Sequence, residues 1–252
     1  MRLAPLFLAA VSAVAPQSLS PQSTGSPGSE PQSHESFYYN VEWRLINAGR
    51  VKLDFRRMGD QGAQANVRVE SAGMVSTLYK VEDNYSVNLN PTLCAESVQM
   101  TSREGSRQRE TKISFDPTAH RASYLERDRV KNTTLLQHEI EIPACVHDVL
   151  GGLMYLRTLN LEPGQSTFVA VTDGKKSVMA KVEAQSHEDI KTPEGVYHTT
   201  CYEAYLFDNV LYKRPAHLQV WISDDKRRIP VQVRVRLQFT IGTITLQLQK
   251  HE

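Results

Sequence analysis

Histidine and acidic residues recur in the chain in patterns that resemble the beginning of a metal site. His138-Glu139 matches the start of a helical zinc motif, but the residue four positions after His138 is Ile142, and Pro143 follows it. Such a motif needs a second histidine on the same face of a helix, and proline disrupts a helix. The sequence has no histidine pair at that spacing and no paired CxxC motif. We therefore expect no metal site and no bound cofactor.

Cys145, His147 and Asp148 lie close together in the sequence and offer a nucleophile, a base and a carboxylate. On a helix, residues two apart point in different directions, so Cys145 and His147 do not form a nucleophile–base pair there. Asp148 falls in the first turn of a predicted helix, where a carboxylate accepts hydrogen bonds from backbone amides. The sequence has no G-x-S-x-G elbow and no glycine-rich phosphate loop. We expect a protein that is not an enzyme.

The three cysteines suggest one disulfide. Cys94 lies in a predicted turn and Cys145 precedes the predicted helix. The hypothesis is that these two residues pair in an oxidising compartment and close a loop of about 50 residues. Cys201, on an apolar strand, is then expected to be a buried free thiol.

The N-terminal segment has the composition of an export signal. Residues 1–15 begin with Met1-Arg2, continue as an apolar run and end in Ala13-Val14-Ala15, which fits a signal peptidase site. Pro16 disfavours cleavage after Ala15, so cleavage after Ala13 is an alternative. Residues 16–34, rich in Pro, Ser and Gln, are predicted to be a disordered linker. We expect an exported, periplasmic or envelope-associated protein with one β-rich domain at 35–252 and no membrane span after signal removal.

Most of the remaining chain alternates apolar and polar residues with a period of two. Apolar side chains occupy every second position in 37–45, 51–55, 218–222 and 231–239, which is typical of strands with one buried face. Asn, Asp, Pro and Gly clusters separate about a dozen such segments at spacings typical of antiparallel hairpins.

Two segments have helical spacing instead. Between Cys145 and Leu159 the apolar residues recur at intervals of three and four, which predicts a helix of about four turns. A shorter helical turn is predicted over Gly73–Val81. The predicted fold is mainly β: a single antiparallel, strongly curved sheet, an incomplete barrel or β-spiral, wrapped around one main α-helix. This arrangement requires Val149, Leu153 and Leu156 to be buried against the sheet, and it requires antiparallel strand pairing throughout.

Charge and composition exclude some partners. The chain has 252 residues, 29 Lys and Arg, 28 Asp and Glu, a net charge of +1, and 40% hydrophobic residues. This composition supports a substantial core, whereas a nucleic-acid binder needs a basic excess or a basic face. The basic residues of 103–131 alternate with acidic ones and have few aromatic neighbours, so they indicate the solvated face of a hairpin. We expect no nucleic-acid partner.

The chain resembles the exported bacterial family catalogued as domain of unknown function 3108. The segments that carry the resemblance are Phe37–Trp43 followed by Ala48-Gly49, Asp148–Arg157, Thr192–Gly195, Val220–Val231 and Ile241–Ile244. The resemblance implies a β-rich domain of the periplasm or envelope, and it carries no known reaction and therefore no catalytic residues. It also implies kinship with half-barrel carriers of lipids or lipoproteins, an analogy at the level of the fold.

These features favour a non-enzymatic binding or carrier domain for a lipid-like or peptide ligand. A curved sheet closed by the helix would form an apolar cleft. The expected cleft residues are Trp43, Phe55, Met74, Leu78, Leu153 and Tyr155. The alternative function is that of a structural or assembly protein of the envelope that binds another protein or a polysaccharide through its sheet edges or its wet face.

Overall fold

A computed structural model describes residues 33–237 and 242–252. The N-terminal strands are β1 (Ser33–Trp43), β2 (Ile46–Arg57), β3 (Ala63–Ser71), β4 (Val81–Leu89), β5 (Ala95–Glu104), β6 (Arg107–Asp116), β7 (Arg121–Asp128) and β8 (Thr133–Glu141). The later strands are β9 (His147–Asp148), β10 (Ser166–Thr172), β11 (Ser177–Thr192), β12 (Gly195–Ala204), β13 (Ala216–Ser223), β14 (Pro230–Leu237) and β15 (Thr243–His251). The helices are η1 (Gly59–Gln61, a 3₁₀ turn), α1 (Gly73–Leu78) and α2 (Val149–Leu156). The prediction of a mainly β chain is confirmed.

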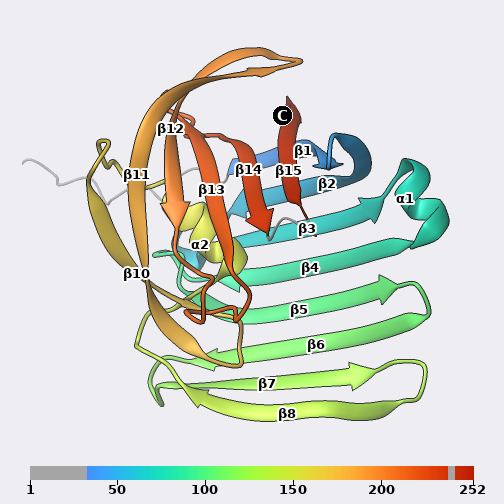
Figure 1. Cartoon of the computed structure of the whole chain (residues 1–252). Coiled ribbons are helices and arrows are strands. Elements are labelled where there is room, and N and C mark those ends of the chain that lie inside the picture. The colour runs from blue at the N-terminus through green and yellow to red at the C-terminus, as the bar shows by residue number, and fades with distance from the viewer. Residues whose placement is uncertain (1–32, 238–241) are drawn as a thin grey trace, which may run out of the picture.

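The described strands form one sheet of 15 strands in the order β8-β7-β6-β5-β4-β3-β2-β1-β15-β14-β13-β12-β11-β10-β9. On each side of the central β1–β15 pair, neighbouring strands are therefore consecutive in the sequence. The β1–β15 pair itself joins the first strand to the last. The edge strands β8 and β9 do not pair with each other, so the sheet is not closed. In Figure 1, β3 to β8 run across the view, whereas β10 to β13 cross them steeply, and α2 lies between the two sets.

Alternation of side chains explains why these segments pair with one face toward the interior. In β2, Val51, Leu53 and Phe55 are buried, while Lys52 and Asp54 between them remain partly exposed. Antiparallel neighbours in register place apolar residues beside them, and each pair removes more hydrocarbon from water. The concave face of the sheet is therefore the apolar one.

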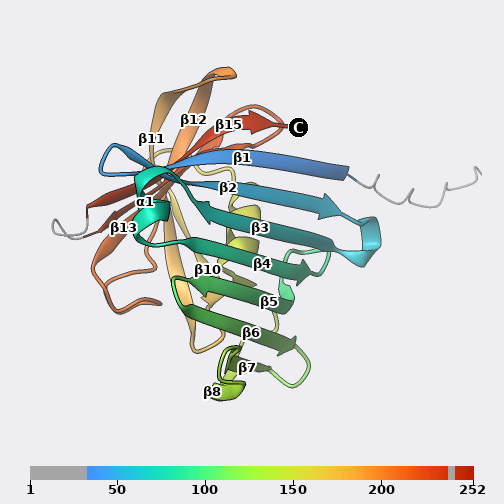
Figure 2. The same cartoon turned by 90° about the vertical axis from the view of Figure 1, so that its right-hand side faces the viewer.

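The buried side chains form two hydrophobic clusters. One lies mainly on β1 to β7 and includes Phe37, Phe55 and Met154, and the other lies mainly on β10 to β13. Two half-buried residues of α2, Leu153 and Tyr155, pack against both clusters. Figure 2 shows the sheet from the side, and Figure 1 shows α1 at its outer edge, between the end of β3 and the start of β4. The helix α2 thus stands where the two halves of the curved sheet meet.

The prediction of a long helix over Cys145–Leu159 is wrong in its limits. The helix has eight residues, Val149–Leu156, because His147 and Asp148 are extended and pair with β10. Thr158 and Leu159 continue past its end through backbone bonds to Tyr155 and Leu156. Of the three residues expected to be buried, Leu156 is buried and Leu153 is half-buried, but Val149 is 41% exposed.

Other expectations also need correction. The β9–β10 pairing is parallel over two residue pairs, so the sheet is not antiparallel throughout. The first helical turn ends at Leu78 and does not reach Val81, which opens β4. The first strand begins at Ser33, two residues before the predicted start of the domain. The predicted signal peptide, 1–15, and the predicted linker up to residue 32 lie outside the described residues.

Candidate functional site

Asp148 fixes the start of α2. Its Oδ2 accepts a hydrogen bond from the backbone amide of Leu150 over 3.0 Å, and its Oδ1 accepts one from the amide of Gly151 over 2.8 Å. The Tyr85 hydroxyl also donates to Asp148 Oδ2, over 2.7 Å. Burial raises the pKa of the Asp148 carboxyl, while these three donors favour its charged form. The capping role expected from the sequence is confirmed, and it ties α2 to β4.

Gly151 allows this close approach. A Cβ atom on Gly151 would lie 2.6 Å from Asp148 Oδ1 and 2.8 Å from Leu89 Cδ2. Both distances are shorter than a Cβ atom tolerates, so a side chain here would force Asp148 or Leu89 to move. The next residue, Gly152, has no such neighbour, because its nearest contacts would be Val171 Cγ1 at 3.8 Å and His147 Cβ at 3.9 Å.

His147 and the disulfide hold the segment that leads into the helix. The Nδ1 atom of His147 lies 2.7 Å from the carbonyl oxygen of Leu93, and its ring stacks on Tyr155 with 4.4 Å between the ring centroids. Burial lowers the pKa of His147, and the bond to Leu93 opposes this shift. A disulfide joins Cys94 and Cys145, as expected from the sequence, with the two Cα atoms 5.2 Å apart. The Leu93 carbonyl and the Tyr155 ring thus hold His147 in place, and its lowered pKa favours the neutral imidazole. We assign His147 a structural role.

A cavity of about 370 Å³ lies between the two halves of the sheet, with α2 as one wall. Its walls come from β3 to β5, from α2, and from β10 to β14. The lining residues are Val67, Val69, Asp83, Tyr85, Met100, Val149, Leu150, Gly152, Leu153, Tyr155, Leu156, Leu159, Val169, Val171, Ala180, Val182, Ala204, Leu206, Leu218, Val220 and Val233. Aliphatic side chains dominate this surface, and Asp83 is its one charged member.

The structure brings together only part of the cleft expected from the sequence. Leu153 and Tyr155 line the cavity. Phe55 is buried in the hydrophobic cluster of β1 to β7, and Trp43 is half-buried at the end of β1. Met74 and Leu78 belong to α1 and are 72% and 80% exposed. None of these last four residues is part of the cavity lining.

Sequence reasoning missed most of the far wall. Val169, Val171, Ala180 and Val182 come from two adjacent strands, and their alternation was visible, but nothing in the sequence told which interior they face. Asp83 was not among the expected cleft residues, because the expected cleft consisted of apolar and aromatic side chains. Its inward position follows from its phase, since it stands two residues before Tyr85 on β4.

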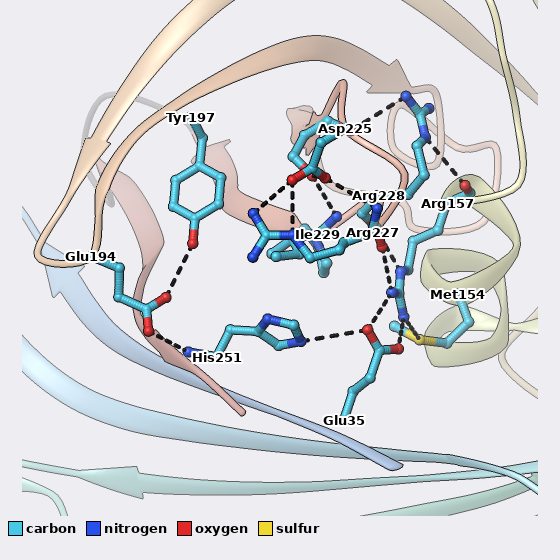
Figure 3. A network of polar contacts seen from close by, with 12 residues as sticks. Glu35, Met154, Arg157, Glu194, Tyr197, Asp225, Arg227, Arg228, Ile229 and His251 are labelled. Carbon is cyan, nitrogen blue, oxygen red and sulfur yellow. Dashed lines mark hydrogen bonds and ion pairs between the residues drawn. The ribbon is translucent and has the colours of Figure 1, made fainter. Parts of the chain in front are cut away.

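The C-terminal end of α2 is held by a separate polar network, shown in Figure 3. The Arg157 guanidinium donates to both carboxylate oxygens of Glu35, over 2.8 and 2.9 Å, and to the backbone carbonyls of Arg227 and Arg228. His251 Nε2 lies 3.4 Å from Glu35 Oε1. The network therefore connects α2, β1, β15 and the turn before β14, and it contributes to positioning the helix wall of the cavity.

An open polar groove lies beside this network, bordered by Glu194, Tyr197, His198, Asp225 and Arg227. Asp225 and Arg227 pair with each other over 2.6 Å, and Glu194 accepts from the Tyr197 hydroxyl. Within residues 33–237 and 242–252, no group of three or more His, Cys, Asp or Glu side chains is arranged to hold a metal ion. The apolar cavity is therefore the stronger candidate for a binding site.

The family model described as protein of unknown function, DUF3108, matches residues 38–249. The chain belongs to the DUF3108 family. The resemblance inferred from the sequence is thereby confirmed. No curated protein matches this DUF3108 chain. In the described part of the chain, no helix combines the length and apolar character that a membrane crossing requires.

Two solved structures are similar to the DUF3108 domain. The first is a β-barrel-like protein of the domain of unknown function DUF1849 from Brucella abortus, with 8% identity and a TM-score of 0.54, over 87% of this chain and 97% of that chain. The second, from Bacteroides fragilis, has a YmcC-like fold, 8% identity and a TM-score of 0.34, over 86% and 95% of the two chains. The first likeness supports a shared barrel-like fold, and the second is too distant to support an argument.

Proposed function

We propose that this DUF3108 domain is a non-enzymatic binding or carrier protein for a lipid-like ligand, located in the periplasm or the cell envelope. The observation that carries the proposal is the cavity of about 370 Å³ with an almost wholly aliphatic wall. Ligand sites are typically apolar clefts of roughly 300–1,000 Å³ with a few placed polar groups. A peptide is a poorer match, because its backbone amides and carbonyls need partners that an aliphatic wall does not supply.

An aliphatic tail gains free energy in such a cavity. Each methylene taken from water contributes about 0.8 kcal/mol, so a tail of about eight methylenes gains roughly 6 kcal/mol before the costs of ordering and association. The half-buried wall residues Val67, Leu153 and Leu218 would lose their remaining contact with water at the same time.

The polar groups beside the cavity support a role without catalysis. Asp148 caps α2, Tyr85 donates to Asp148, and His147 contacts the Leu93 carbonyl. Each of these groups is already used to hold α2 in place. The Cys94–Cys145 disulfide supports export, because such bonds persist in oxidising compartments.

The first experiment asks what the native protein carries. The full chain is expressed in a bacterium with its own N-terminal segment, purified from the periplasm, and extracted with organic solvent for lipid mass spectrometry. Binding of the neutral apolar fluorophore N-phenyl-1-naphthylamine is then measured on the delipidated protein. We expect a copurified amphiphile and a saturable fluorescence increase. The absence of both would contradict the proposal.

Variants at Gly152 test whether the ligand binds in the cavity. Gly152 lines it from α2, and a Cβ there meets nothing closer than 3.8 Å. Gly152→Leu should fill part of the space and weaken fluorophore binding roughly tenfold, about 1.4 kcal/mol. Gly152→Ala, the matched control, should change binding much less. Equal binding by both variants would show that the fluorophore binds elsewhere.

The edge strand β8 favours a second candidate function, that of an assembly protein that binds a partner. Eight of its nine residues are exposed, including Leu135 and Leu136, and one side of β8 has no neighbouring strand among the described residues. Such edges accept a strand from another chain. A photo-crosslinker at Leu135 in cells should then give one discrete protein adduct, while the same crosslinker at the exposed Phe168 should not. No adduct at Leu135 would contradict this function.

A further inference from the structure

Asp83 projects from the cavity wall at a defined position. On the inner face of the sheet, Tyr85 of β4 stands between Val67 of β3 and Met100 of β5. Two residues earlier on β4, Asp83 stands between Val69 and Ser102, so the carboxylate forms the next row on the same face. Asp83 is half-buried and lines the cavity. The apolar wall therefore ends in one carboxylate toward the α1 end of the sheet.

The carboxylate has one hydrogen-bond donor and no cationic partner in the described part of the chain. Its Oδ1 accepts from the backbone amide of Arg103 over 3.0 Å. Burial raises the pKa of Asp83, the Arg103 amide opposes this shift, and the nearby Glu104 carboxylate adds to it. Glu104 pairs with Val81, one step further out along β4. Two acidic side chains thus lie at this end of the cavity, and the inner one has unused capacity to accept hydrogen bonds.

We infer that the cavity binds a single-chain amphiphile whose polar end is a protonated amine, with the chain along the aliphatic wall and the ammonium group against Asp83. This assignment rests on the proposed function and names its ligand class. The ammonium group would supply the missing cation and donate to the free oxygen of Asp83 in a charge-assisted hydrogen bond. The low-dielectric aliphatic wall beside Asp83 strengthens that attraction relative to water.

The same geometry disfavours an anionic head group. A fatty-acid carboxylate at this position would meet Asp83 and Glu104, two groups of its own charge, in surroundings that screen them poorly. It would also find no side-chain cation among the other lining residues, which are aliphatic, aromatic, methionine or glycine. An alcohol head group, which is neutral and can donate one hydrogen bond, is intermediate.

The test compares three ligands with the same chain and different head groups. Decylamine, 1-decanol and decanoate displace N-phenyl-1-naphthylamine from the delipidated protein at neutral pH. We expect decylamine to bind at least roughly tenfold more tightly than decanoate, with 1-decanol between them. Asp83→Asn should weaken decylamine binding by about tenfold and strengthen decanoate binding. The matched control is Glu82→Gln, which removes a carboxylate from the adjacent residue of β4 on the opposite face of the sheet.

The outcomes separate this inference from the proposed function. If the fluorophore binds but decanoate competes as well as decylamine, the head-group assignment is wrong and a lipid-binding cavity stands. If Asp83→Asn and Glu82→Gln change decylamine affinity equally, Asp83 does not contact the head group. If the fluorophore does not bind and no amphiphile copurifies, the proposed function itself fails. Should Asp83→Asn not fold, the three-ligand comparison on the natural chain still decides the assignment.

Discussion

The Tyr85 hydroxyl donates a hydrogen bond of 2.7 Å to Asp148, and this bond joins the middle of β4 to the residue that starts α2. One end of the helix wall is therefore tied to one half of the sheet by a part-buried side-chain hydrogen bond. At the other end, Arg157 is held by Glu35 of β1. The helix is short, so its position depends on these two ends more than on its own hydrogen bonds.

Replacing Tyr85 with Phe should lower the free energy of unfolding by about 1–2 kcal/mol, because Asp148 then loses a donor while it stays buried. Urea unfolding followed by circular dichroism measures this loss. The control is Tyr79→Phe, at an exposed tyrosine just after α1. Equal stability of Tyr85→Phe and the natural chain would show that the bond contributes nothing.

The adjacent glycines of α2 should respond to alanine in opposite directions. Gly151→Ala places a methyl group against Asp148 and Leu89 and should destabilise the fold by about 1–3 kcal/mol. Gly152→Ala meets no close neighbour and should stabilise by about 0.5–1 kcal/mol, because alanine favours a helix over glycine. Thermal unfolding of the two variants side by side checks the signs. A loss of stability at Gly152→Ala would contradict the geometry of this wall.

Removal of the disulfide should cost about 2–4 kcal/mol, because the bond closes a long loop in the unfolded chain. The Cys94→Ser, Cys145→Ser double variant is compared with the natural chain in urea. Thiol titration of the denatured, unreduced protein should find one reactive group, Cys201, out of the three cysteines. A count of three would show that the disulfide does not form.

Acid should weaken the segment around His147. Burial holds the pKa of His147 below its ordinary value of 6.5, with the Leu93 carbonyl and Asp148 acting in the opposite direction. Well above pH 6.5, the His147 imidazole is neutral in both the folded and the unfolded chain. As the pH falls below 6.5, the unfolded chain takes up a proton that the folded chain resists, so stability falls by up to about 1.4 kcal/mol per pH unit until the folded pKa is reached.

The measurement for His147 is the change in unfolding free energy between about pH 7.5 and about pH 5.5. Other groups also titrate in this range, so the informative quantity is the difference between the natural chain and His147→Asn, which keeps a donor for the Leu93 carbonyl. We expect a smaller acid loss in the variant. Identical acid losses would show that His147 does not resist protonation in the folded state.

Much of the architecture follows from local patterns. Residues such as Val51, Leu53 and Phe55 revealed their strand because a period of two is a local signal, and Asp148 revealed its cap because its role depends on the next three residues. The limits of α2 were not accessible in the same way. Residues 145–148 have helical spacing, but the disulfide to Cys94 and the pairing of His147 with Val171 keep them extended.

The cavity was harder to predict than the sheet. Leu153 and Tyr155 were correctly predicted to line the cavity, because they belong to the helix that the curved sheet was expected to wrap around. Met74 and Leu78 were expected beside them from a shared apolar pattern, yet α1 lies between the end of β3 and the start of β4, at the outer edge of the sheet (Figure 1), and both side chains are exposed. Which residues line the cavity together depends on the order of the strands in the sheet. The alternation along one strand contains no information about that order.

The division of the hydrophobic interior into two clusters has a consequence for cooperativity. Leu153 and Tyr155 touch both clusters, and they are also exposed to the cavity. The two halves of the sheet are joined by the β1–β15 pairing and, across the interior, by the short helix α2. A guest molecule that touches β4 on one side and β11 on the other would act as a missing piece of the core and couple the halves mechanically. Loading and unloading would then change the rigidity of the whole domain.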